Sequence, residues 1–198
     1  MKKSILAVLL TAVLILPVFA SEKKDMEIDV KFGYILDNNV KLYLAENTNS
    51  GSTNRGCVLE TDFYYYAASN LALGLGVNYI FDSKANYGYD DTYGFTNVYF
   101  AIKPKMDLDS DILDSFYFIG QIGYGLFRFE CKEDDRGIKS PDIENGLYWA
   151  LGVGLEIESN FVVELIHSFN YGYLNIGNNR NDMRYSALSI NVGYKFNL

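Results

Sequence analysis

The sequence predicts an all-β fold, an eight-stranded antiparallel up-and-down β-barrel that spans a membrane, and three observations lead to this prediction. Bulky apolar residues alternate with small or polar residues in eight segments, which is the period of two that a strand requires. Each segment reaches the roughly 9 to 11 residues that a tilted strand needs to cross a bilayer. The connections between the segments are alternately long and short, as in transmembrane barrels.

The predicted strands follow one another along the chain after a separate N-terminal segment. They cover residues 26–36, 57–67, 71–81, 94–104, 115–130, 146–158, 161–173 and 184–198. The long connections are 37–56, 82–93, 131–145 and 174–183, and the shorter ones are 68–70, 105–114 and 159–160. An even number of strands places the first and last strand ends on one side, which we expect to be the periplasmic side.

Residues 1–20 are predicted to be a cleaved signal peptide. Lys2 and Lys3 precede the apolar run 5–16, and Val18-Phe19-Ala20 provides compact residues at the recognition positions of a cleavage site. The apolar run is shorter than the roughly 20 residues that a spanning helix needs. The predicted organisation is therefore a signal peptide at 1–20 and one barrel domain at 21–198.

The two faces of each predicted strand distinguish a membrane barrel from a soluble one. In segment 71–81 one face carries Leu, Val, Tyr and Phe, whereas the other carries Ala72, Gly74, Gly76, Asn78 and Ile80. A soluble lipocalin-like barrel would turn the bulky face inward, but five or six bulky groups from every strand overfill an eight-stranded interior. We therefore expect the bulky faces to contact lipid.

The opposite faces are expected to fill the barrel with a hydrogen-bonded polar plug instead of an open pore. Glycines leave space there, at Gly33, Gly76, Gly123, Gly125, Gly152, Gly154, Gly172 and Gly193. Charged residues on the same faces are costly next to lipid and costly when unpaired, so they should pair across the lumen. The candidates are Glu27, Asp29, Lys31, Glu60, Asp62, Lys103, Glu156, Glu164 and Lys195.

The last predicted strand carries hydrophobic residues at every second position, at Ile190, Val192, Tyr194, Phe196 and Leu198. It resembles the C-terminal signal by which the barrel assembly machinery recognises outer-membrane barrels, with Leu198 where that family usually has Phe. Over residues 26–198 the chain resembles the eight-stranded OmpA- and OmpX-like barrels, which include opacity and adhesion-type surface proteins. The resemblance implies a Gram-negative-type outer membrane, with membrane lipids, lipopolysaccharide and the assembly machinery as partners.

Composition and spacing suggest no cofactor, metal or nucleic acid. The 198-residue chain has a formal net charge of −8, which does not suit binding to nucleic acid. Its single His and two distant Cys show no metal-ligand spacing. Cys57 and Cys131 are expected at the extracellular rim, where a disulfide and free thiols both remain possible.

An enzyme is not predicted, although one pair of residues raises the question. Some outer-membrane barrels deacylate lipid A with a His and a Ser two residues apart on one strand. Here His167 and Ser168 are adjacent, so alternation sends them to opposite faces, and Glu164 and Asn170 lie with Ser168. No nucleophile, base and orienting residue share one face of this strand.

The long connections supply the remaining candidates for function. Tyr87, Tyr89 and Tyr93 suit a binding surface or an aromatic girdle, Arg55 adds a basic group, and Asp90, Asp91, Asp134 and Asp135 are acidic without spelling out a Ca²⁺ loop. The predicted function is a non-enzymatic outer-membrane barrel whose loops serve envelope stability, adhesion or recognition of a host or surface ligand. The alternatives are a narrow porin-like channel for small solutes and a lipid A-modifying enzyme.

Overall fold

The computed structural model describes residues 26–43, 48–51, 56–84, 92–110, 112–130, 142–158, 160–176 and 179–198. The predicted signal peptide at 1–20 lies outside these residues. Within them, no helix is long and apolar enough to cross a membrane.

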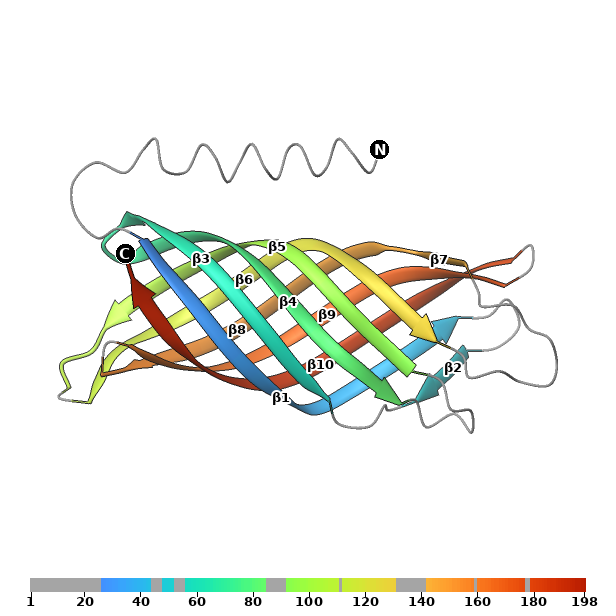
Figure 1. The fold of residues 1–198 in the computed structure, drawn as a ribbon, viewed down its shortest axis with the longest axis horizontal. Coiled ribbons are helices and arrows are strands. Elements are labelled where there is room, and N and C mark those ends of the chain that lie inside the picture. The colour runs from blue at the N-terminus through green and yellow to red at the C-terminus, as the bar shows by residue number, and fades with distance from the viewer. Residues whose placement is uncertain are drawn as a thin grey trace.

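Eight long antiparallel strands form the wall of a barrel, and two short strands extend it at one end (Figure 1). The wall consists of β1 (Met26–Tyr43), β3 (Cys57–Ala68), β4 (Leu71–Lys84), β5 (Thr92–Asp107), β6 (Leu113–Glu130), β8 (Gly146–Ile157), β9 (Phe161–Ile176) and β10 (Asn179–Asn197). The short strands are β2 (Thr48–Gly51), which pairs with β1, and β7 (Asp142–Glu144), which pairs with β9. The predicted fold class, an eight-stranded antiparallel all-β barrel, is confirmed.

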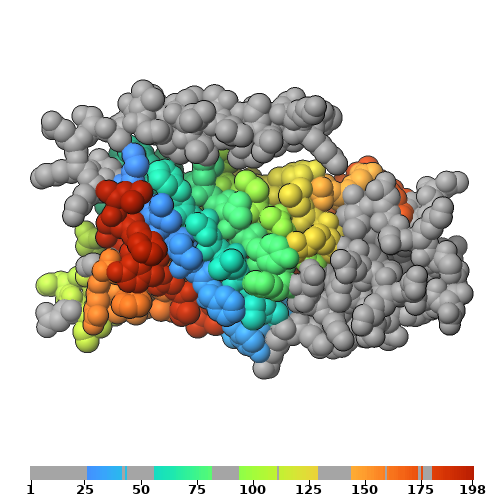
Figure 2. Space-filling model, in the orientation of Figure 1, coloured from blue at the N-terminus to red at the C-terminus, as the bar shows by residue number. Residues whose placement is uncertain are grey.

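The last strand closes the barrel against the first. β10 pairs with β1 in antiparallel register from Glu27↔Asn197 to Tyr43↔Asp182. The space-filling view shows the C-terminal strand, in red, lying directly against the N-terminal strand, in blue (Figure 2). Closure satisfies the backbone groups that an open sheet edge would expose, which a wall in contact with hydrocarbon requires.

The two ends of the barrel differ. At one end, here called the turn end, short connections follow β3, β5 and β8, and the backbone N–H of Leu198 donates to the carbonyl of Met26 at 3.0 Å. At the other end, here called the extended end, β1, β9 and β10 continue and recruit β2 and β7 (Figure 1). The barrel thus has a compact end and a projecting one.

The predicted loops at 37–56 and 174–183 are partly wrong, because β1, β9 and β10 run well into them. A bulge between Ile35 and Asp37 shifts the alternation by one residue. After it, Asn38 and Val40 are buried inside the barrel while Lys41 is exposed. The polar run after residue 36 therefore continues the strand, although a fixed period of two suggests that it ends there.

The two faces of the wall differ as predicted. Large apolar side chains are exposed on the outside of every wall strand, among them Phe32, Leu59, Leu73, Phe100, Ile122, Leu151, Leu165 and Val192. The predicted lumen glycines are buried or half-buried. At Gly76 a Cβ would overlap the Asp62 carboxylate and the Tyr99 ring, and at Gly154 it would overlap the Tyr117 ring. These two positions lack a side chain because large lumen side chains occupy the space.

Candidate functional site

The lumen contains a buried ionic cluster centred on Lys31, on β1. Its ammonium group lies 2.8 Å from Glu60 Oε1, 2.6 Å from Asp62 Oδ2 and 2.8 Å from Glu164 Oε2. All four side chains are almost fully buried. One lysine therefore serves three carboxylates from two other strands, β3 and β9.

A second ionic cluster lies nearer the turn end and is centred on Lys103 and Glu156. Lys103 Nζ lies 2.7 Å from Glu27 and 3.2 Å from Asp29. Glu156 Oε2 accepts from Lys105 at 2.6 Å and from Lys195 at 2.8 Å. Here three lysines face three carboxylates, so this second cluster is balanced in charge.

Tyrosine and amide side chains join the two clusters into one network. Lys103 Nζ lies 4.4 Å from the centre of the Tyr117 ring, while the Tyr117 hydroxyl donates to Glu164 at 3.0 Å. Gln121 donates to Glu60 at 3.1 Å and accepts from the Tyr148 hydroxyl at 2.6 Å. These contacts spread the carboxylate charge over hydrogen-bond donors and rigidify the lumen.

An apolar layer fills the lumen between this network and the extended end. Phe95 packs against Phe127 with ring centres 4.8 Å apart and against Tyr185 at 4.5 Å. The rest of the layer consists of Ile35, Val40, Val58, Ile80, Met183 and Ala187, all buried. An apolar layer without charge opposes passage of ions, because an ion crossing it would lose its hydration.

The predicted charged residues all take part in this plug. Glu27, Asp29, Lys31, Glu60, Asp62, Lys103, Glu156, Glu164 and Lys195 are buried and paired, so their predicted placement in the lumen is confirmed. Lys105 was not among the predicted lumen residues, although it lies two residues after Lys103 and shares its face. The tyrosines were missed as well, because alternation alone does not reveal which partners a lumen hydroxyl meets.

His167 and Ser168 lie on opposite sides of the wall, which confirms the prediction for this pair. His167 is exposed on the outside, where its ring contacts Phe169 at 4.3 Å between ring centres, and Ser168 is buried inside.

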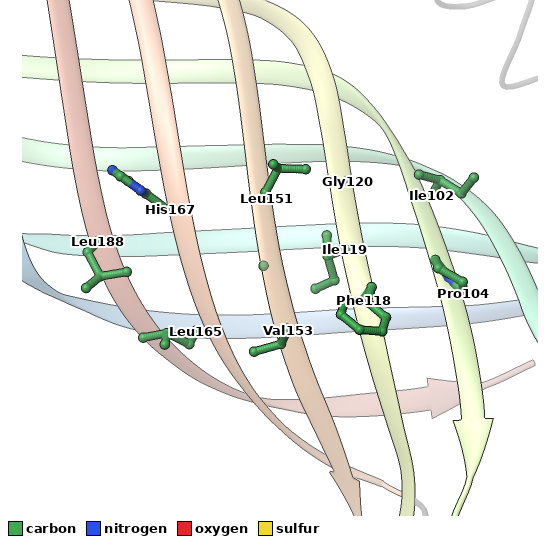
Figure 3. Close-up of a pocket in the computed structure, with 11 residues that line it drawn as sticks. Ile102, Pro104, Phe118, Ile119, Gly120, Leu151, Val153, Leu165, His167 and Leu188 are labelled. Carbon is green, nitrogen blue, oxygen red and sulfur yellow. The ribbon is translucent and has the colours of Figure 1, made fainter.

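A shallow apolar hollow runs across the outer wall from His167 on β9 to Ile102 and Pro104 on β5 (Figure 3). Gly120, which has no side chain, helps to form it. Among the described residues, no group of His, Cys, Asp or Glu is arranged to hold a metal.

At the extended end the outer wall carries arginines stacked on tyrosines. Arg180 lies 3.7 Å from the centre of the Tyr173 ring and pairs with Glu144 of β7 at 2.9 Å. The guanidinium of Arg184 lies 4.8 Å from the Tyr43 ring centre and 5.7 Å from that of Tyr171. This end therefore has an amphipathic surface that projects beyond the packed lumen.

Several predicted residues lie outside the described part of the chain. They are Arg55, Tyr87, Tyr89, Asp90, Asp91, Cys131, Asp134 and Asp135. Cys57 is described as a free thiol at the start of β3, at the extended end as predicted. Tyr93 is described as part of β5, where it pairs with Ser83 and Phe129 in register.

Comparison with known sequences finds one family. The model of the outer membrane protein beta-barrel domain matches residues 6–196. No curated protein sequence matches the chain significantly.

Comparison with solved structures finds small outer-membrane barrels. Neisserial surface protein A is 16% identical with a TM-score of 0.51, covering 87% of this chain and 97% of its own. OprG of Pseudomonas aeruginosa is 16% identical with a TM-score of 0.50, covering 90% and 99%. Ail, the attachment invasion locus protein of Yersinia pestis, is 14% identical with a TM-score of 0.50, covering 87% and 99%. At these identities the likeness concerns the fold.

Proposed function

This chain belongs to the outer membrane protein beta-barrel family, and from that premise we propose that it is a non-enzymatic surface protein whose extended end recognises or adheres to a ligand outside the cell. Its location is the outer membrane of a Gram-negative-type envelope. The barrel acts as a sealed scaffold for the extended end. We expect the ligand to be a host or surface component.

The orientation follows from the family's general build. Outer-membrane barrels have short periplasmic turns and longer extracellular connections. The turn end, with Met26 and Leu198, therefore faces the periplasm, and the extended end faces outward. Ile190, Val192, Tyr194 and Phe196 are exposed on the outside of β10, and Leu198, directly after this strand, is exposed as well. This exposure suits the proposed recognition of β10 by the assembly machinery during insertion.

The observation that carries the proposal is the contrast between a filled lumen and a projecting end. The ionic network and the apolar layer fill the barrel interior and disfavour a role in transport, whereas β1, β2, β7, β9 and β10 build a platform beyond the packed part. Binding residues tend to lie on connections held by a rigid scaffold. Ail shares this fold and is named for attachment, so the fold is compatible with such a role.

Shortening the extended end tests the proposal. In the test variant, residues 174–181 are replaced by Asn-Gly, so that a two-residue turn joins Tyr173 to Asp182, which are already register partners. We expect bacteria with this variant to adhere to a cultured epithelial layer several-fold less than wild-type bacteria, and about as poorly as a deletion strain.

The matched control alters the turn end. Ser69→Asn with Asn70→Gly changes the turn between β3 and β4 and leaves the extended end intact, so adherence should be unchanged. Heat-modifiable gel migration confirms that each variant folds. Wild-type adherence in the deletion strain would refute the proposal, and so would normal adherence of the shortened variant.

The alternative of a channel makes a separate prediction. Refolded wild-type protein in a planar lipid bilayer should show no stable conductance, because ions would have to cross the layer around Phe95, Phe127 and Tyr185. A general porin recorded under the same conditions serves as the positive control. Reproducible open events that scale with protein concentration would favour the channel.

The alternative of a lipid A-modifying enzyme is disfavoured by the placement of its candidate residues. The wall separates His167 from Ser168, so the imidazole cannot act as base for that hydroxyl. Mass spectrometry of lipid A from deletion and wild-type strains should give the same profile. A mass change that depends on the gene would restore the enzyme hypothesis.

A further inference from the structure

Two like charges lie directly opposite each other on the outer wall near the extended end. Lys41 of β1 and Arg184 of β10 are Cα partners in the ladder, and both side chains are exposed. Like charges directly opposite on neighbouring strands destabilise a sheet. Neither residue forms an ion pair with any carboxylate of the described residues, although Asp182 lies two residues from Arg184 on the same exposed face of β10.

The arginine of this pair is already held in place. Its guanidinium lies over the rings of Tyr43 and Tyr171, with Tyr171 its register partner on β9. Stacking uses the face of the guanidinium, so its N–H groups point outward from its edge. Those N–H groups can bind a tetrahedral oxyanion through two parallel hydrogen bonds, with the Lys41 ammonium as a third donor.

The pair also lies at the level of lipid headgroups. The exposed apolar side chains of β10 run from Ile190 to Phe196. Along the barrel axis Arg184 lies about 30 Å from Phe196, at about 3.3 Å per residue and a tilt of about 40°, so it lies just beyond an apolar band of about 25 Å that begins at Phe196. The chain as a whole is acidic, so attraction of an anion here would be local.

We propose that Lys41 and Arg184 form a binding site for the phosphate group of an outer-leaflet lipid. The anion bridges the two cations and relieves their repulsion, while Tyr43 and Tyr171 contact the apolar part of the headgroup region. This site is independent of the ligand proposed to bind at the extended end. Arg180 provides the contrast, because it stacks on Tyr173 in the same way but already has Glu144 as its partner.

The test compares lipids that differ only in phosphate. Refolded protein in detergent is given equal amounts of diphosphorylated lipid A and its dephosphorylated form, and the lipid retained is measured by native mass spectrometry. Wild-type protein and Arg180→Gln should retain the phosphorylated form about tenfold more, as expected for a charge-assisted bidentate contact. Arg184→Gln and Lys41→Glu should lose this preference.

Lys41→Glu keeps the proposal testable even if Arg184→Gln folds poorly, because it places an opposite charge beside Arg184 and should leave the barrel stable. Gel migration verifies folding of each variant. The proposal is overturned if wild-type protein shows no preference, or if Arg180→Gln loses as much preference as Arg184→Gln. It is also overturned if millimolar inorganic phosphate abolishes lipid retention, because the site would then bind free anion.

Discussion

Replacing Lys31 by Met is expected to lower the free energy of unfolding by about 3–5 kcal/mol, the usual cost of removing one partner from a buried ionic cluster. Lys31 is the cation bound to Glu60, Asp62 and Glu164. Without it, three buried carboxylates would face one another with only neutral donors such as Tyr117 and Gln121. Urea titration of the refolded protein in lipid vesicles measures the change.

Two further variants show whether the loss of stability comes from the carboxylates left without Lys31. Lys105→Met should cost far less, because Lys105 is 15% exposed and its partner Glu156 keeps Lys195 at 2.8 Å. Combining Lys31→Met with Glu60→Gln, Asp62→Asn and Glu164→Gln should recover most of the lost stability, since a neutral cluster needs no counter-charge. If Lys31→Met lowers the free energy of unfolding no more than Lys105→Met does, the cluster around Lys31 does not stabilise the lumen.

The sequence sufficed to predict the wall and the charged lumen because both follow from one rule. In a barrel of fixed alternation, the face of each residue is set by parity within its strand. Lys31, Asp62 and Glu164 belong to three different strands. In each strand the residue lies on one face, and the bulky apolar residues lie on the other face. Hydrocarbon excludes charge from the outside, so parity alone placed them inside.

The extended end could not be predicted in the same way. The bulge between Ile35 and Asp37 changes parity, and nothing in the run of polar residues after Leu36 marks it. β2 (Thr48–Gly51) and β7 (Asp142–Glu144) have little intrinsic strand propensity. They form because they pair with β1 and β9. The apolar layer was also hidden, because near this end both faces carry apolar residues, as at Ile80 and Phe81.

The second large effect on stability is expected from a charge placed on the lipid-facing side of the wall. Leu151 lies midway along β8 (Gly146–Ile157) and thus near the middle of the lipid-facing wall, is 60% exposed on its outside, and lines the hollow of Figure 3. An arginine at the bilayer midplane of a barrel costs about 2–4 kcal/mol, falling to about 0–1 near the interfaces. Leu151→Arg should therefore lower the free energy of unfolding in lipid vesicles by about 2–4 kcal/mol.

The control is the same substitution nearer the membrane surface. Leu147 is on the same face of β8, is 48% exposed, and lies about 10 Å closer to the extended end along the barrel axis. Leu147→Arg should cost about 1 kcal/mol or less, since its guanidinium reaches the headgroups. In water the two exposed positions would tolerate arginine equally. A difference between the variants that depends on depth thus requires hydrocarbon around Leu151, whereas equal stabilities would contradict the membrane-spanning placement of this wall.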